Sequence, residues 1–295
     1  MRVAILGPLE VESAAVGGAR LRRLLVRLAL AAALQEEHEA EHPVLAIRWG
    51  LSMALTSLAE THAVFGDFDQ GLEAMDEAVR LLLELNPESD VAHQRVWQAS
   101  ILMRKGDLQR GRAVLRALTD APEGRETPAR NVAFAHVELG HLARQEGDLR
   151  AAERHYAAAG HAMEDGTAIA PQFRALLLVG QAHLAVAAHD HTTAARHAER
   201  AAELVMAAAD MPVLARVAVA VAELCAARGD LLPGATALGA AEQLRGAPDA
   251  ANPDVARVAA RLREGLGEEA FAAAFTRGRT LDRAHAVELA TGGPR

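Results

Sequence analysis

A Gly-Asp turn recurs along the chain at an almost constant spacing, and this repetition is the strongest constraint on its fold. The turns begin at Gly66, Gly106, Gly147 and Gly229, and a weaker copy, HDHTTAARHA, begins at His189. Successive copies stand 40 to 42 residues apart. Self-similarity at such a period is typical of stacked helix pairs, because each unit buries its apolar face only against its neighbours. The sequence therefore predicts an all-α array of about five repeats.

Each copy carries the signals of one helix ending and another beginning. Glycine tolerates the left-handed conformation that closes a helix, and the aspartate that follows it can cap the next helix. A small residue follows in the first turn of the next helix, where two helices must approach closely. Examples are Gly71 in GDFDQG and Gly111 in GDLQRG. The pattern predicts helical hairpins throughout the array.

The chain after the last turn predicts an atypical end to this array. Three helices are expected: one beginning at Pro253, one following Gly267, and one capped by the Thr280 hydroxyl with Asp282 in its first turn. Helical arrays need such ends to cover their final apolar face. We therefore expect a repeat array over residues 35–245 and a helical C-terminal cap over residues 246–295.

Composition narrows the class of protein further. Hydrophobic residues make up 51% of the chain but aromatic residues only 3%, which favours closely packed Ala- and Leu-rich helices. The only lysine, Lys105, lies in RKGDL, so there is no Walker A phosphate loop. The single cysteine, Cys225, cannot form an internal disulfide, which favours a reducing compartment. We expect a soluble cytoplasmic protein that binds no cofactor and is not an enzyme.

Two segments of the array carry a family resemblance. VELGHLARQEGDLRAAERHYAAA and LTSLAETHAVFGDFDQGLEAMDEA each resemble a tetratricopeptide repeat. In the first segment the matching residues are Leu139, Gly140, Gly147, Leu149, Ala152, Tyr156 and Ala159. The period is longer than the family's usual length of about 34 residues. This longer form, together with the sequence of the cap, resembles the C-terminal sensor arrays of large bacterial transcriptional regulators of the AfsR and MalT (LuxR-like) type.

The N-terminus carries a second resemblance. MRVAILGPLEV followed by GGARLRRLLVRLAL resembles the start of the winged-helix DNA-binding domain of the SARP family, the antibiotic-regulatory activators of actinobacteria. Residues 1–34 would then form a short β-ribbon and one helix, a truncated remnant without a recognition helix. The remnant holds five arginines and two acids, whereas the rest of the chain is acidic. The residues it offers for DNA contact are Arg20, Arg22, Arg23 and Arg27.

The tetratricopeptide resemblance also implies a binding site. In that family the first helix of each repeat lines a concave groove at its second, fifth, ninth and twelfth positions. Taking each turn glycine as position fifteen, the polar residues at such positions include Glu60, His93, Ser100, His141, Arg144, His183, Arg216 and Glu223. A row of hydrogen-bonding side chains suits a protein or peptide partner, or a small effector. An ordinary hydrated surface is the alternative interpretation.

These patterns predict a regulatory protein-interaction module related to SARP and AfsR regulators. A second copy of the chain is a further candidate partner. No membrane partner is expected, because the Ala-rich helices lack a basic face with aromatic residues. The alternative function is a DNA-binding transcriptional activator of secondary metabolism that acts through residues 1–34.

A zinc-dependent hydrolase is a minor alternative. It rests on HEAEH, in which His38 and His42 match the HExxH spacing of zinc ligands and Glu39 the general base. Two features oppose this interpretation. Glutamates crowd the motif, which makes it a solvated strip, and Pro43 disfavours helical geometry at His42. The sequence therefore predicts no metal site.

Overall fold

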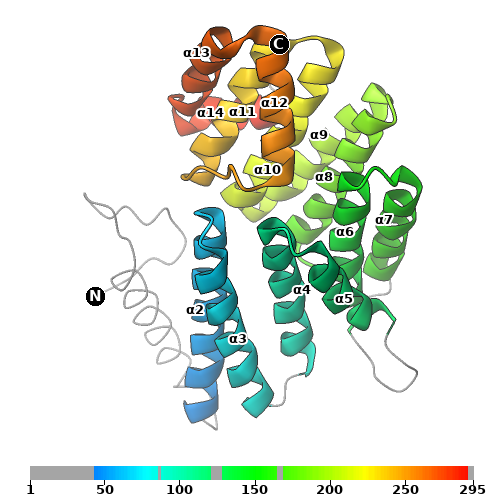
Figure 1. The fold of residues 1–295 in the computed structure, drawn as a ribbon, viewed down its shortest axis with the longest axis vertical. Helices are drawn as coiled ribbons and strands as arrows, with labels where there is room; N and C mark the ends of the chain where they lie inside the picture. Colours follow the sequence, from blue (N-terminus) through cyan, green and yellow to red (C-terminus); the bar gives the residue numbers. More distant parts are fainter. Residues whose placement is uncertain (1–42, 86–87, 121–127, 165–168, 292–295) are drawn as a thin grey trace.

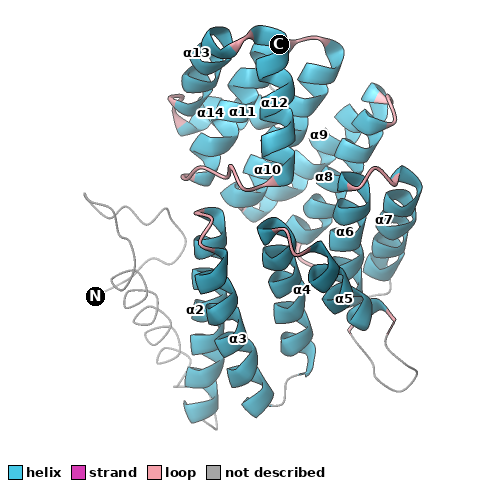
Figure 2. Ribbon diagram, viewed as in Figure 1, coloured by secondary structure: helices cyan, strands magenta, loops and turns pink. Residues whose placement is uncertain are grey.

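The computed structural model describes residues 43–85, 88–120, 128–164 and 169–291. Within these ranges all regular secondary structure is α-helical, and no β-strand occurs (Figure 2). The expected all-α fold is therefore confirmed for this part of the chain. The predicted β-ribbon and helix of residues 1–34 and the HEAEH motif lie outside the described residues.

Ten of the described helices form five consecutive pairs, in which the two members pack closely against each other (Figure 1). Each first helix also packs against the first helix of the next pair, so the pairs stack in series. The pairs are α2 (Pro43–Val64) with α3 (Phe68–Leu85), α4 (Glu88–Lys105) with α5 (Leu108–Thr119), α6 (Ala129–Gln145) with α7 (Leu149–Glu164), α8 (Pro171–Ala187) with α9 (His191–Ala208), and α10 (Met211–Arg228) with α11 (Leu231–Arg245).

The predicted turns between paired helices are present at all five positions. The glycines adopt positive φ angles, for example 85° at Gly66 and 92° at Gly229, and His189 has a φ of 62°. In each turn the backbone N–H of the following aspartate donates back into the preceding helix, as from Asp148 to the Ala143 carbonyl at 2.9 Å. This bond satisfies a carbonyl that the end of the helix leaves unpaired.

Small residues allow paired helices to approach each other closely. A Cβ atom added at Gly71 would lie 3.0 Å from the carbonyl oxygen of Ala59 on the partner helix. Another close approach occurs between α11 and the cap, where a Cβ at Gly239 would lie 2.0 Å from the carbonyl oxygen of Phe275. At Gly239 the backbones are too close for any larger side chain, whereas at Gly71 a larger side chain would require the partner helix to shift slightly.

The cap consists of α12 (Pro253–Leu266), α13 (Glu268–Arg279) and α14 (Arg283–Thr291), which pack against α10 and α11 (Figure 1). The prediction that Thr280 caps the third helix is wrong. The Asp282 carboxylate instead accepts the hydrogen bond from the His285 backbone N–H at 3.0 Å. Thr280 lies at the end of α13, and its hydroxyl donates to the Thr276 carbonyl at 2.9 Å.

The core is built from alanine, leucine and valine, as the low aromatic content predicts. Its largest fully buried side chain is Tyr156. The Tyr156 ring passes between Gly140 and Gly180, where an added Cβ would lie 2.4 Å and 2.7 Å from ring carbons. None of the helices in the described part of the chain combines the length and the apolarity that a membrane-spanning segment needs.

Candidate binding site

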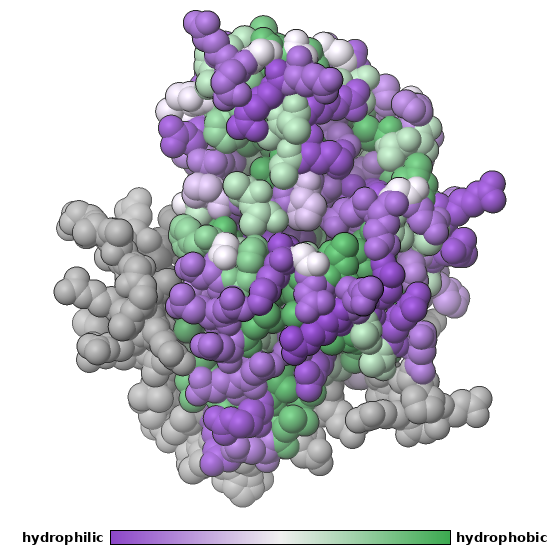
Figure 3. All heavy atoms as spheres, in the orientation of Figure 1, coloured by the Kyte–Doolittle hydropathy of each residue, from purple (hydrophilic) through white to green (hydrophobic). Residues whose placement is uncertain are grey.

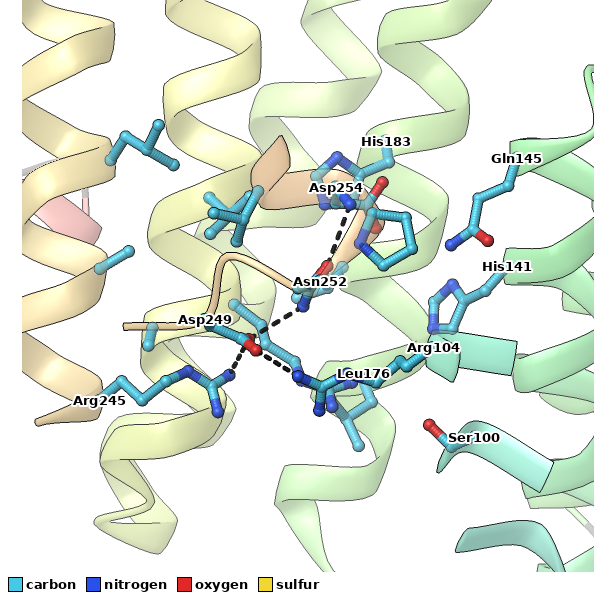
Figure 4. A pocket seen from close by; sticks show the side chains of 18 of the residues that line it. Ser100, Arg104, His141, Gln145, Leu176, His183, Arg245, Asp249, Asn252 and Asp254 are labelled. Carbon is cyan, nitrogen blue, oxygen red and sulfur yellow. Dashed lines mark hydrogen bonds and ion pairs between the residues drawn. The ribbon is translucent and has the colours of Figure 1, made fainter. Parts of the chain in front are cut away.

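A cavity lies between the first helices of the five pairs and the C-terminal cap (Figure 4). Its cap compartment, next to α11 and α12, has a volume of about 90 Å³. Its N-terminal compartment, bounded by α2, α4, α8 and α10, has a volume of about 280 Å³. Both compartments are lined by Ser100, Arg104, Leu176, Arg216 and Arg245, so we treat them as one central cavity. Its size approaches that of a small-molecule site.

The connection between α11 and α12 places one carboxylate between two arginines of the cavity wall (Figure 4). Asp249 accepts from the Arg104 guanidinium at 2.6 Å and forms an ion pair with Arg245 at 3.1 Å. The side-chain amide of Asn252 donates to the same carboxylate at 3.1 Å. Burial lowers the pKa of both arginines, and Asp249 opposes this effect. The ion pairs with Asp249 therefore keep these two desolvated guanidinium groups charged and hold them in place.

Arg216 of α10 lines both compartments and differs from these two arginines. Among the described residues, no carboxylate lies within ion-pair distance of its guanidinium. Burial raises the pKa of Glu60 to about 7, although Arg216 opposes this rise. Burial also raises the pKa of Glu138, while Arg216 and a hydrogen bond with Ser100 lower it. Near neutral pH the Glu60 carboxyl therefore compensates the charge of Arg216 only in part.

A second set of charges, which we call the cap network, joins α12 to the array. It consists of Arg144, His183, Glu223, Asp254 and Arg257. Asp254 accepts from Arg144 at 2.7 Å and from Arg257 at 2.8 Å. Glu223 accepts from Arg257 at 3.0 Å and hydrogen bonds with the His183 ring. These contacts connect helices that are far apart in the sequence.

The pKa values show which members of the cap network are ionised. Burial raises the pKa of Glu223, but hydrogen bonds from His183 and Arg257 lower it to about 2. Burial likewise raises the pKa of Asp254, but His183, Arg144 and Arg257 hold it well below its ordinary value. Both carboxyl groups are therefore ionised at neutral pH, and the network is a set of largely buried ion pairs.

His141 of α6 lies at the cavity wall in its neutral form. Burial, together with the charge of Arg144, lowers the pKa of His141 to about 3. Its Nδ1 atom lies 2.8 Å from the hydroxyl of Tyr156. His141 is therefore an uncharged hydrogen-bonding group that faces the cap compartment.

The structure separates the predicted groove residues into three groups. Glu60, Ser100, His141, His183 and Arg216 line the central cavity. Arg144 and Glu223 are buried, and their side chains are bound by the N-terminal turn of α12.

His93 lies away from the cavity lining, in an aromatic cluster. The Trp97 indole N–H donates to His93 Nε2 at 3.0 Å, and the Phe134 and Phe173 rings lie 5.8 and 6.1 Å from the His93 ring. The candidate DNA contacts Arg20, Arg22, Arg23 and Arg27 lie outside the described residues.

Sequence reasoning missed several charged residues of the site, among them Arg104, Glu138, Arg245 and Asp249 at the cavity and Asp254 and Arg257 in the cap network. Arg104 lies one position beyond those expected to face the groove, and Asp249 lies in a connection with no repeat numbering. The Arg104–Asp249 pair spans 145 residues of sequence. Local sequence patterns carry no signal for a contact over such a separation.

Comparisons with known proteins identify no family: no family model matches the chain, and no curated protein is significantly similar to it. In the described ranges, no three His, Cys, Asp or Glu side chains gather in an arrangement that could hold a metal ion. The arrangement at the cavity instead combines fixed charges, a neutral histidine and Arg216, a cationic side chain without an ionic partner in the described part of the chain. These features suit recognition of a polar ligand.

Proposed function

We propose that this chain is a regulatory interaction module of the kind found in SARP and AfsR-type transcriptional regulators. In this proposal the helix pairs are tetratricopeptide-like repeats that form a solenoid. The module binds a partner or a small effector in the central cavity, acts in the cytoplasm and catalyses no reaction. The single observation that carries the proposal is the cavity itself, in which Arg216 faces the open space without an ionic partner among the described residues.

The sequence supports the family assignment in this proposal. The matches to the tetratricopeptide pattern fall at turns and at buried positions, such as Gly147 and Tyr156. The first helix of every pair contributes to the cavity, which is the face that the family uses for binding. Stacked pairs create such concave surfaces through a small rotation per repeat.

The arrangement of the cap favours a compact ligand or a short segment of a partner over a long helix. The connection bearing Asp249 and the first turn of α12 bearing Asp254 already occupy part of the concave face. On the face of the molecule drawn in Figure 3, hydrophilic and hydrophobic residues are interspersed. A ligand must therefore enter the space that the cap leaves free.

The test is retention of a bound species by the full chain. Tagged protein would be purified from a bacterial lysate and examined by native mass spectrometry and by proteomics for co-purifying small molecules and proteins. We expect the wild-type chain to retain at least one species that Arg216→Gln loses, because the variant removes the charge in the cavity.

Arg200→Gln is the matched control. Arg200 lies on α9, and its side chain is 61% exposed beside Glu203. This variant should retain the same species as the wild type. Equal retention by Arg216→Gln and wild type, or no species retained by either, would contradict the proposal.

A further inference from the structure

We propose that the N-terminal compartment of the cavity binds a small organic anion, a carboxylate or a phosphate ester, through Arg216. The apolar part of this ligand would lie against Trp97 and Phe173. This inference rests on the proposed function and names the chemical class of ligand for the same site.

The charges of the compartment favour an anion at Arg216. Three arginines, Arg104, Arg216 and Arg245, line it together with the acidic residues Glu60 and Asp210. The charges of Arg104 and Arg245 are compensated by one carboxylate, that of Asp249, at 2.6 and 3.1 Å. Arg216 has no such carboxylate among the described residues. A carboxylate or phosphate group of a ligand can supply the missing negative charge, because guanidinium groups bind both kinds of group through paired hydrogen bonds.

Asp249 is an internal example of the kind of group that arginines of this cavity bind. It is an internal carboxylate held by two arginines and by the amide of Asn252 (Figure 4). Arg216 lines the same two compartments as these arginines. The same chemistry that binds Asp249 is therefore available once more, on a side chain that faces the free space.

The shape of the compartment favours a small molecule over a polypeptide. Its volume is about 280 Å³, close to the lower limit of typical small-molecule pockets. Trp97 of α4 and Phe173 of α8 are half-buried and form an apolar wall. The Asp249 connection and α12 occupy the adjoining face. An anionic head with a compact apolar body matches these walls.

Glu60 gives the site a pH dependence. The Glu60 pKa is about 7, and the groups that act on it are Arg216 and Asp210 of the α10 region, Arg245 of α11 and Arg104 of α4. As the pH rises from 6 to 8, Glu60 becomes ionised, competes for Arg216 and repels a second anion. The affinity for a carboxylate, whose own charge stays constant over this interval, should therefore fall.

The test uses two anionic probes and one neutral probe on the full chain. Phenylacetate and phenyl phosphate represent the two anion types, and phenylacetamide is the uncharged analogue of the first. At millimolar concentrations, calorimetric titration should show binding of at least one anion and no binding of the amide. The anion that binds more tightly identifies the chemical class. Equal binding of phenylacetate and phenylacetamide, or binding of no probe, would overturn the inference.

Variants locate the binding site. Arg216→Gln should weaken anion binding roughly tenfold or more, Arg216→Lys should weaken it less, and Arg200→Gln should leave it unchanged. Glu60→Gln should make phenylacetate binding independent of pH between 6 and 8, because the charge of this probe is constant over that interval. Anion binding that survives Arg216→Gln in a folded variant would place the site elsewhere.

These results separate the two proposals. Retention of a cellular species through Arg216, combined with no probe binding, would refute the anion inference and leave the proposed function standing. If Arg216→Gln leaves retention unchanged, the proposed function fails whatever the probes show.

Discussion

Replacement of Asp254 by asparagine should detach the N-terminus of α12 from the array. Asp254 accepts hydrogen bonds from Arg144 at 2.7 Å and from Arg257 at 2.8 Å. The Arg144 side chain is only 4% exposed, whereas that of Arg257 is 45% exposed and also pairs with Glu223. The substitution therefore leaves one buried cation without its counter-charge.

The magnitude follows from this burial. Removing one partner of a buried ion pair costs about 3–5 kcal/mol, because the remaining charge stays desolvated. Asparagine keeps a neutral acceptor for Arg144, and Arg257 keeps Glu223. The lower end of the range, about 3 kcal/mol, is therefore expected for the free energy of unfolding. The loss should be concentrated in the cap, because Asp254 is a contact between α12 and the array.

Urea unfolding followed by circular dichroism measures the total loss, and hydrogen exchange of the α12 amides locates it. Asp69→Asn is the matched control, because Asp69 pairs with Lys105 at the surface and its side chain is 81% exposed. It should cost less than about 0.5 kcal/mol. Adding Arg144→Met to Asp254→Asn should restore part of the lost stability, since it removes the unpaired charge. Equal losses in Asp254→Asn and Asp69→Asn would refute the reasoning.

Gly239→Ala should destabilise the chain by about 1–3 kcal/mol, because its Cβ would lie 2.0 Å from the Phe275 carbonyl oxygen. Gly160→Ala has no contact closer than 3.9 Å and should be neutral or slightly stabilising in the same urea assay. The Glu223 pKa of about 2 lies below its ordinary 4.5, so its contribution is present above pH 4.5 and is lost as the pH falls towards 2. Acid unfolding should therefore be less steep in Glu223→Gln than in wild type. The Glu60 pKa is raised from 4.5 to about 7, so stability is lost as the pH rises through this range. Glu60→Gln should gain roughly 1–3 kcal/mol relative to wild type between pH 5 and 8 in thermal or urea unfolding.

The turns between helices could be predicted from sequence because their chemistry is local. A glycine followed by an aspartate is a signal of only two residues, and it marks a positive φ angle at the glycine. The four turn glycines all adopt this conformation: Gly66, Gly106, Gly147 and Gly229. The copy at His189 shows that the repeat spacing carries information beyond residue type, because a non-glycine residue takes a φ of 62° there.

The site could be predicted only in part because it depends on contacts between distant segments. Repeat numbering alone suffices to place Ser100 and Arg216 on first helices. It cannot reveal that Asp249 reaches Arg104 across 145 residues, since that contact depends on how the stacked pairs curve. For the same reason it does not distinguish Arg144, which the cap covers, from a residue that faces open space.

The most direct test of the central claim is retention of a cellular partner or effector by the full chain, compared between wild type and Arg216→Gln. Loss of the retained species in Arg216→Gln, with normal retention in Arg200→Gln and unchanged circular dichroism in both, is the predicted result. Identical retention in all three proteins would show that the central cavity is not the binding site.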